Sequence, residues 1–328
     1  MKDYGKNYLY DQGIDKIGFI NDTVNLPGDT LFNFKLFKEN FSFRWERPQY
    51  VNDHHIRFPY YGIPKENPIK LITPVPKNFK TLITKEKNKD TLNFWFPEIE
   101  ADSLQFELKT KDSVLKTNVV FYRPELDSFY ITPVQNNFFD LGDTLRFDGS
   151  LPISEINSKF ISLRNKDSIQ IPFEINVNKN KDQANLFFKT DPNDKYEIEL
   201  LPNTFIDFWG KTNDTIKLKL TTKSTESFGI INVQLDWKVE KQKFILELIN
   251  EKNEVSRRVV KSNSIDLYKF ENLNPGNYKL RLIFDKNENN KWDSGNYLKK
   301  IQPEKVIYLP DKIELRENWE VNQVFILK

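Results

Sequence analysis

The chain has 328 residues, a formal net charge of +2 and no cysteine. That length suits roughly two to four small domains, and the nearly balanced charge gives no electrostatic reason to expect nucleic acid or an anionic membrane as partner. The lack of cysteine excludes disulfides, thiolate zinc sites and cysteine nucleophiles. No apolar run reaches the roughly 18 residues of a transmembrane segment, and residues 1–13 lack the apolar core of a signal peptide.

Composition and periodicity both point to strands. Aromatic residues make up 14% of the chain, and alanine occurs only at Ala101 and Ala184. This mixture favours strands over helices, although an AT-rich genome would produce a similar bias, so the periodicity has to decide. Alternating apolar and polar residues predict half-buried strands, in chain order, at 30–37, 103–110, 215–220, 244–248 and 278–284. Because turn clusters separate these runs and no long 3.6-residue period is present, the sequence predicts an all-β fold of tandem antiparallel β-sandwiches.

Four segments follow from the turns and from prolines near the proposed strand entries, such as Pro48 and Pro133. The first ends at the strand LFNFKLF, the second runs from FSFRWERP to NVVFYRP, the third from LDSFYITP to IKLKLTTK, and the fourth begins near SFGIINVQL. We therefore expect boundaries that divide the chain into 1–40, 41–123, 124–222 and 223–328.

A short motif occurs twice, at the start of the chain and near its end. Both copies have the form D-x-x-x-N-x-x-[YW]-D-x-G, and the matched positions are Asp3, Asn7, Tyr10, Asp11 and Gly13 in one copy and Asp285, Asn289, Trp292, Asp293 and Gly295 in the other. A full set of predicted strands, 230–284, precedes the second copy, whereas the first follows Met1 almost directly. Residues 1–40 are therefore expected to be the C-terminal remnant of a second sandwich, and the chain a C-terminal fragment, a processed form or the product of a truncated reading frame.

The fourth segment also resembles a known family. The runs FGIINVQL, FILELINEKNEV and FENLNPGNYKLRLIFDKNENNKWDSGNYLKKIQPEKVIYLPDKIELRENWEV are similar to the transthyretin-like or carboxypeptidase-regulatory-like sandwich that ends Ig-like-domain proteins of the Bacteroidota. The run YEIELLPNTFIDFWGKTNDTIKLKLTT resembles the end of the bacterial Ig-like domains in the same proteins. The resemblance covers 190–328 well, 1–40 less well and 41–190 poorly.

This resemblance implies an Ig-like sandwich at 124–222 and a transthyretin-like sandwich at 223–328. It also implies a lipoprotein of the cell envelope, associated with the outer membrane on its periplasmic or surface face. The signal and the lipobox cysteine of such proteins are not among these residues, so the location rests on the resemblance.

The second copy of the motif is also a calcium candidate. Calcium takes six to eight oxygen ligands, and an EF-hand-like loop supplies them at positions 1, 3, 5, 7 and 9; those positions hold Asp285, Asn287, Asn289, the carbonyl of Lys291, and Asp293. Position 12 is Asn296 rather than glutamate, and position 6 is Asn290, which tolerates a positive φ. The favoured alternative is a structural turn in which these side chains accept backbone N–H groups. The first copy has Gly5 in place of Asn287 and so loses a ligand.

The remaining chemical signals are weak. Trp292 and Tyr10 could stack on a ligand, but a plug that packs each loop onto its sandwich is the favoured interpretation. His54 and His55 are the only histidines, and in a strand they would point to opposite faces and could not readily share a metal. No G-x-S-x-G, H-E-x-x-H or phosphate-binding glycine loop is present. No catalytic residue is therefore predicted, and only carboxylates clustered around one of the histidines would favour catalysis.

These observations predict a non-enzymatic structural or protein-binding module of the bacterial cell envelope, such as an accessory subunit of an outer-membrane assembly. A protein partner would bind at sandwich edges or loop ends, in part by strand addition. No nucleic-acid partner, transmembrane segment or cofactor other than the calcium candidate is expected. Two alternatives stay open: a carbohydrate-binding or adhesive surface module, with coplanar exposed aromatic residues, and an accessory region of a hydrolase.

Overall fold

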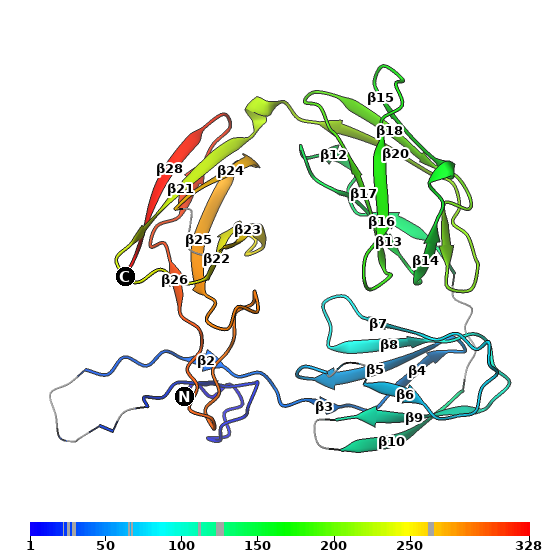
Figure 1. Ribbon diagram of the computed structural model, residues 1–328, viewed down its shortest axis with the longest axis horizontal. Helices are drawn as coiled ribbons and strands as arrows, with labels where there is room; N and C mark the ends of the chain where they lie inside the picture. Colours follow the sequence, from blue (N-terminus) through cyan, green and yellow to red (C-terminus); the bar gives the residue numbers. More distant parts are fainter. Residues whose placement is uncertain are drawn as a thin grey trace. The chain divides into compact units, whose positions relative to one another are not determined.

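The computed structural model describes the whole chain except residues 22, 25, 26, 28–30, 65, 67, 111, 112, 123–127 and 262–265. It forms two compact units, with residues 1–40 and 224–328 in unit 1 and residues 41–223 in unit 2 (Figure 1). The only helices in the described ranges are the 3₁₀ turns Ser158–Phe160 and Thr225–Ser227, so the predicted all-β class is confirmed. Neither turn has the length or apolar character for a membrane crossing.

The first core of unit 2 lies between two antiparallel sheets. One sheet contains β3 (Arg44–Trp45), β4 (Gln49–Asn52), β5 (His55–Tyr61), β7 (Leu82–Lys85) and β8 (Thr91–Trp95), and the other has the order β10 (Val114–Val120), β9 (Ser103–Lys109), β6 (Ile69–Leu71). β9 shows how the predicted alternation works, because Leu104, Phe106 and Leu108 are buried and the residues between them are not. The Phe106 ring meets those of Phe58 and Phe94 from the opposite sheet, at 5.0 and 5.1 Å.

A second sandwich in unit 2 has its own core. One sheet has the order β11 (Ile131–Pro133), β13 (Leu145–Gly149), β17 (Gln183–Phe188), β16 (Phe173–Val177), and the facing sheet β12 (Asn137–Phe139), β20 (Ile216–Thr222), β18 (Lys195–Leu200), β15 (Ile161–Asn165). A short pair, β14 (Ile153–Ile156) and β19 (Phe205–Asp207), completes it. Phe147 and Phe205 meet inside the core at 5.9 Å. The predicted boundary at 123/124 lies outside the described residues.

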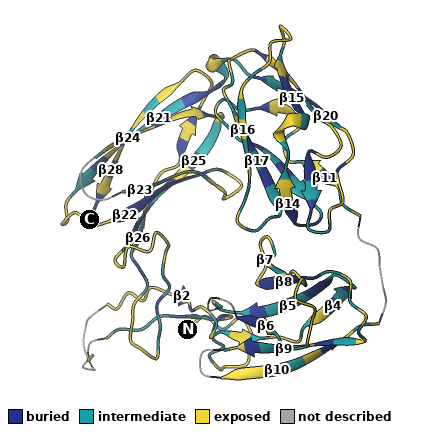
Figure 2. Cartoon of the chain, turned by 45° about the vertical axis from the view of Figure 1, so that its right-hand side comes forward, coloured by how far each residue is buried: buried dark blue, intermediate teal, exposed yellow. Residues whose placement is uncertain are grey.

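Unit 1 contains the third sandwich. One sheet has the order β24 (Leu267–Leu273), β21 (Gly229–Trp237), β28 (Glu320–Leu327). The other has the order β23 (Val255–Lys261), β22 (Phe244–Ile249), β25 (Gly276–Phe284), β26 (Val306–Tyr308), and β27 (Ile313–Leu315) pairs with the start of β25. Figure 1 shows β28 beside β21, with which it pairs in parallel. β22 is buried along its whole length, as the dark blue strand in Figure 2 shows, because both its faces are covered. The assignment of the individual sandwiches to Ig-like or transthyretin-like families stays a prediction.

Residues 1–40 lie in the same compact unit as 224–328. Within 1–40, the described strands are β1 (Lys16–Ile17) and β2 (Phe37–Lys38), which pair with each other. Of the predicted strand at 30–37, residue 30 lies outside the described residues, 31–36 form no strand, and only Phe37 enters one. Phe34 and Leu36 of that run are exposed, because alternation makes a strand only where a neighbouring strand pairs with it. The interpretation of 1–40 as the remnant of another sandwich stays a prediction.

Candidate functional site

The second copy of the motif, residues 285–295, is called loop C here. The Asp285 carboxylate accepts the backbone N–H groups of Asn289 and Asn290 at 3.1 and 2.9 Å. The amide groups of Asn287 and Asn289 both donate to one Asp293 carboxylate oxygen at 2.6 Å. The loop therefore holds itself together through local bonds between side chains and backbone.

The first copy, residues 3–13 or loop N, has nearly the same bonds. The Asp3 carboxylate accepts the N–H groups of Lys6 and Tyr8 at 2.6 and 2.8 Å. Asn7 donates to the Asp11 carboxylate at 2.8 Å, as Asn289 does to Asp293 in loop C. The Asn7 side-chain oxygen accepts the N–H of Leu9 at 2.9 Å, and the equivalent bond in loop C is 2.8 Å long. The repeated sequence motif is therefore also a repeated structure.

Each loop is closed by a carboxylate that lies outside the motif. In loop N, Asp15 accepts the N–H groups of Tyr4 and Asp11, both at 2.8 Å. In loop C, Glu304 accepts the N–H groups at the two equivalent positions, at 2.8 and 3.0 Å. The hydrogen bond from the Asp11 N–H, and to a smaller extent that from the Tyr4 N–H, lowers the pKa of Asp15, because both bonds stabilise the ionised carboxylate.

Sequence reasoning missed these two closing carboxylates. A signal for them existed, since Asp15-Lys16-Ile17 follows one loop and Glu304-Lys305-Val306 the other. The neighbouring backbone matches as well: the N–H of Lys2 donates to the carbonyl of Lys16 at 2.7 Å, and that of Phe284 donates to the carbonyl of Lys305 at 2.9 Å.

Both loops contain left-handed residues at equivalent positions. Lys6 and Tyr8 in loop N have φ of 54° and 63°, and Glu288 and Asn290 in loop C have φ of 61° each. Asparagine adopts this region readily, as the sequence predicted for Asn290, whereas tyrosine does so only under constraint. The Tyr8 side chain is 93% exposed, so its own packing does not provide that constraint.

Hydrogen bonds bring together the side chains of four predicted calcium ligands of loop C, Asp285, Asn287, Asn289 and Asp293, and these side chains already have partners within the loop. The side-chain oxygens of Asn287 and Asn289 accept backbone N–H groups, while their nitrogen atoms face Asp293. Rotating the Asn289 amide to offer its oxygen to a cation would remove the acceptor of the Lys291 N–H, whereas the Asn289 N–H would keep Asp285 if Asn287 rotated. Among the described residues no group of three or more His, Cys, Asp or Glu could hold a metal. Calcium at Asp285, Asn287, Asn289, Lys291 and Asp293 stays a prediction.

The aromatic residue of each loop forms a specific bond. The Trp292 indole N–H donates to the carbonyl of Glu304 at 3.1 Å, and the side chain remains 41% exposed. The Tyr10 hydroxyl donates to the carboxylate of Glu39. Burial, and then the Glu39 carboxylate, raises the pKa of Tyr10 above its usual value.

Residues 1–40 are attached to the segment that follows loop C. The buried carboxylate of Glu39 accepts the Tyr297 N–H at 2.6 Å in addition to the Tyr10 hydroxyl. The Phe19 ring lies against Phe37 and Tyr297, with centroids 5.9 and 5.5 Å away. Glu39 and three aromatic rings therefore join the two parts of unit 1.

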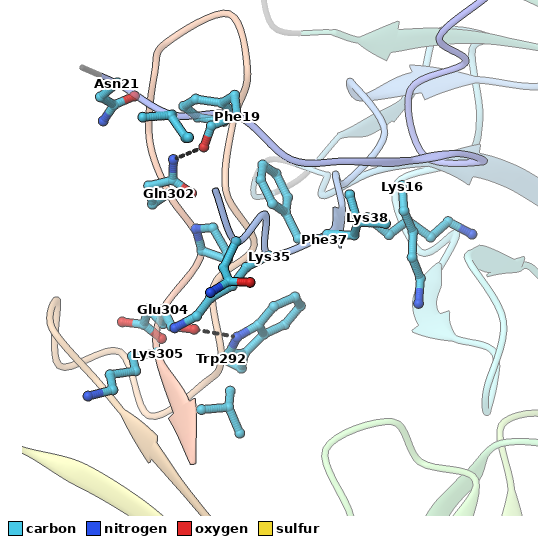
Figure 3. Close-up of a pocket in the computed structure, with 15 residues that line it drawn as sticks. Lys16, Phe19, Asn21, Lys35, Phe37, Lys38, Trp292, Gln302, Glu304 and Lys305 are labelled. Carbon is cyan, nitrogen blue, oxygen red and sulfur yellow. Dashed lines mark hydrogen bonds between the residues drawn. The ribbon is translucent and has the colours of Figure 1, made fainter. Parts of the chain in front are cut away.

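A cavity of about 790 Å³ lies beside this attachment (Figure 3). Its lining combines aromatic rings, amides and lysines. The residues around it are Lys16, Phe19, Ile20, Asn21, Asn33, Lys35, Leu36, Phe37, Lys38, Trp292, Gln302, Pro303, Glu304, Lys305 and Val306.

The two histidines of unit 2 have separate partners. The buried His55 ring stacks on Trp95 at 3.8 Å, and its Nε2 lies 2.9 Å from the Asn93 side-chain oxygen. His54 lies in the preceding turn rather than in the strand, with its ring 5.2 Å from that of Trp209. Both rings therefore have packing partners within unit 2.

No protein-family model matches the chain, and no curated protein matches it. Among solved structures, it is similar to the N-terminal part of the bacterial S-layer protein SbsC, at 10% identity and a TM-score of 0.27, covering 47% of this chain and 40% of that one. It is also similar to the MG0-NIE-MG1 domains of Escherichia coli alpha-2-macroglobulin, at 10% identity and TM-score 0.27, covering 55% and 71%. A third is BcpA, the major pilin subunit of Bacillus cereus, at 12% identity and TM-score 0.21, covering 83% and 84%. The chain spans less than half of the first of these, and at such TM-scores the similarities carry no argument about function.

Proposed function

We propose that the chain is a non-enzymatic structural or protein-binding module of the bacterial cell envelope, an accessory subunit of an outer-membrane assembly. A partner protein binds it by adding a strand to β10. The observation that carries this proposal is the exposed edge of β10 in unit 2.

β10 is seven residues long and lies at the end of its sheet, where its pairing in the described structure is with β9 alone. Its side chains Val114, Leu115 and Val120 are exposed, and Figure 2 shows the strand largely in yellow. Proteins commonly protect such edges with charges, proline or bulges, but Lys116 is the only charged residue of β10. Free backbone groups beside exposed apolar side chains provide what strand addition requires.

The histidine environments support a role other than catalysis. His55 is held between Trp95 and Asn93, and His54 lies against Trp209. In a serine–histidine–aspartate triad or a zinc hydrolase the histidine faces a nucleophile or a metal and is oriented by a further group, whereas the partners given above for these two rings are tryptophan rings and an amide. Both rings instead help to fix the structure of unit 2.

Site-specific cross-linking tests the proposed edge. A photoreactive residue at Lys116 or Asn118 of β10 should give a discrete adduct with an envelope protein in intact cells. The matched control is Asn185 in β17, which is partly exposed and pairs with Arg146 of β13 on one side and with Asn176 of β16 on the other. Adducts that form equally well from Asn185, or none from β10, would contradict the proposal.

Cell fractionation tests the location independently. The chain should be recovered with the outer-membrane fraction, together with the protein that β10 cross-links. Recovery with the cytoplasmic proteins would contradict the envelope assignment whatever the cross-linking shows.

A further inference from the structure

Three lysines form a row across the short strands of residues 1–40. Lys16 pairs directly with Lys38, and Lys2 forms a bridge with Lys16 on the other side. Directly paired residues of antiparallel strands project to the same face. The alternate residues, including Asp15 and Phe37, are buried on the opposite face.

No described carboxylate neutralises this row. Lys16 and Lys38 form no ion pair within the described ranges, and Lys2 lies over the Tyr4 ring at 4.9 Å. The acids next to these lysines in the sequence are already engaged, Asp15 by two backbone N–H groups and Glu39 by Tyr10 and Tyr297. Like charges directly opposite each other on paired strands are unfavourable, so an anion bound across the row would relieve a repulsion.

The same lysines line the cavity beside loop C. Lys16, Lys38, Phe37 and Trp292 all belong to its lining. In Figure 3 the two lysine side chains extend to one side of the Phe37 and Trp292 rings. Phe37 is 4% exposed and Trp292 is 41% exposed, so Trp292 is the ring open to a ligand, and a ligand that meets it and the ammonium groups must be extended.

The polar groups of the lining narrow the class of ligand. The Gln302 amide nitrogen donates to the carbonyl of Phe19 at 2.8 Å, and the Asn21 amide nitrogen donates to that of Lys300 at 3.3 Å. These bonds leave the amide oxygens as acceptors for hydroxyl groups. The indole N–H of Trp292 is also used within the protein, so its ring offers an apolar face.

We propose that this cavity binds a segment of an acidic polysaccharide. The Trp292 face packs against the C–H face of a sugar, the Gln302 and Asn21 oxygens accept its hydroxyl groups, and Lys16 and Lys38 bind its carboxylate or sulfate groups. A sugar chain supplies hydroxyl donors, anions and flat apolar faces together. The site lies in unit 1 and does not depend on the proposed edge of β10 in unit 2.

Affinity electrophoresis of the full chain tests the proposal, with polygalacturonate and chondroitin sulfate as probes. Dextran serves as the neutral glycan and a single-stranded DNA oligonucleotide as the competing polyanion. The acidic polysaccharides should retard the protein, and dextran should not. Lys16→Ala/Lys38→Ala and Trp292→Ala should each weaken binding about tenfold, the effect of losing one strong contact.

Matched controls distinguish the site from general charge and aromatic content. Lys252→Ala/Lys312→Ala removes two exposed lysines elsewhere in unit 1, and Trp319→Ala removes a tryptophan that is 49% exposed. Neither control should change the affinity. Should Trp292→Ala fail to fold, as judged by its melting temperature, Trp292→Phe keeps a ring and is expected to keep most of the binding.

Three results would overturn the proposal. One is no retardation by either acidic polysaccharide. Another is equal binding of the DNA oligonucleotide, unaffected by the Trp292 variants, which would show a general attraction between the lysines and polyanions. The third is a loss of binding in the control variants as large as that in the site variants.

Discussion

The hydrogen bond from Tyr10 to Glu39 is the most informative contact to remove. Glu39 is 4% exposed and receives one donor from loop N, Tyr10, and one from the segment after loop C, Tyr297. Tyr10→Phe removes the first donor without creating a large void. Glu39→Gln keeps the shape of the side chain but removes its charge, and the double variant completes a thermodynamic cycle.

The expected magnitude follows from the charge on this acceptor. A hydrogen bond to an ionised group contributes about 1.5–3 kcal/mol, and more is lost when a buried partner is left unsatisfied. Each single variant should therefore lower the local free energy of unfolding of unit 1 by about 2 kcal/mol. The double variant should cost little more than either single one, so a coupling energy of about 1–2 kcal/mol is expected.

Native-state hydrogen exchange of residues 285–305 measures this local stability, and the Tyr297 amide reports directly on Glu39. Tyr4→Phe is the matched control, because Tyr4 lies in the same loop and its hydroxyl forms no bond within the described structure. A coupling energy below about 0.5 kcal/mol, which is the usual limit of additivity, would refute the bridging role of Glu39.

The raised pKa of Tyr10 adds a dependence on pH. Burial and the Glu39 carboxylate favour the protonated hydroxyl in the folded state. The resulting stability is present below the unfolded pKa of about 10 and is lost as the pH rises through the higher folded value. In Tyr10→Phe, the free energy of unfolding should therefore fall less between about pH 10 and higher pH than it does in the unaltered protein.

Three further changes probe the loops. Tyr8→Gly should raise the free energy of unfolding of unit 1 by about 1 kcal/mol, measured by hydrogen exchange, because φ of Tyr8 is 63° and its exposed ring loses little packing. Asn290→Gly should raise it less, because asparagine tolerates this conformation. Destabilisation by Tyr8→Gly would contradict the steric reasoning. The lowered pKa of Asp15 contributes stability at pH values above its unfolded pKa of about 4, and this stability is lost as the pH falls through the folded pKa. Asp15→Asn should therefore reduce the fall in melting temperature on acidification. An unchanged dependence of the melting temperature on pH would argue against this role. Calcium should give no heat in titration calorimetry and no melting shift, because loop C is already satisfied internally; heat abolished by Asp285→Asn and Asp293→Asn would instead establish a calcium site.

Of the five runs predicted as strands, the four that have partner strands, at 103–110, 215–220, 244–248 and 278–284, form them. The alternation in 103–110 and 278–284 places apolar residues in shared cores, and β9 and β25 form there. The same pattern in 31–36 gives no strand, because its apolar side chains meet no facing sheet. Period-two sequence thus favours a strand but leaves its pairing to the rest of the chain.

The motif predicted the two loops and their internal hydrogen bonds, but not the carboxylates outside it that close and attach them. Its positions describe contacts within about a dozen residues, which local hydrogen bonding can enforce. Asp15, Glu304 and Glu39 lie outside it, and Glu39 is 258 residues from Tyr297. Such partners become visible only when the fold brings them together, although the acid-Lys-aliphatic triplet after each loop was a usable signal for two of them.

The glycine that ends the motif shows why two copies of one pattern need separate explanations. Gly13 has φ of 75°, so in loop N glycine is required by the backbone conformation. At Gly295 a Cβ atom would lie 2.6 Å from the Phe37 ring and 2.6 Å from the carbonyl oxygen of Ile301. Phe37 belongs to residues 1–40, so the first part of the chain is one of the two reasons for a glycine in loop C. The same residue type therefore serves local conformation in loop N and tertiary packing in loop C.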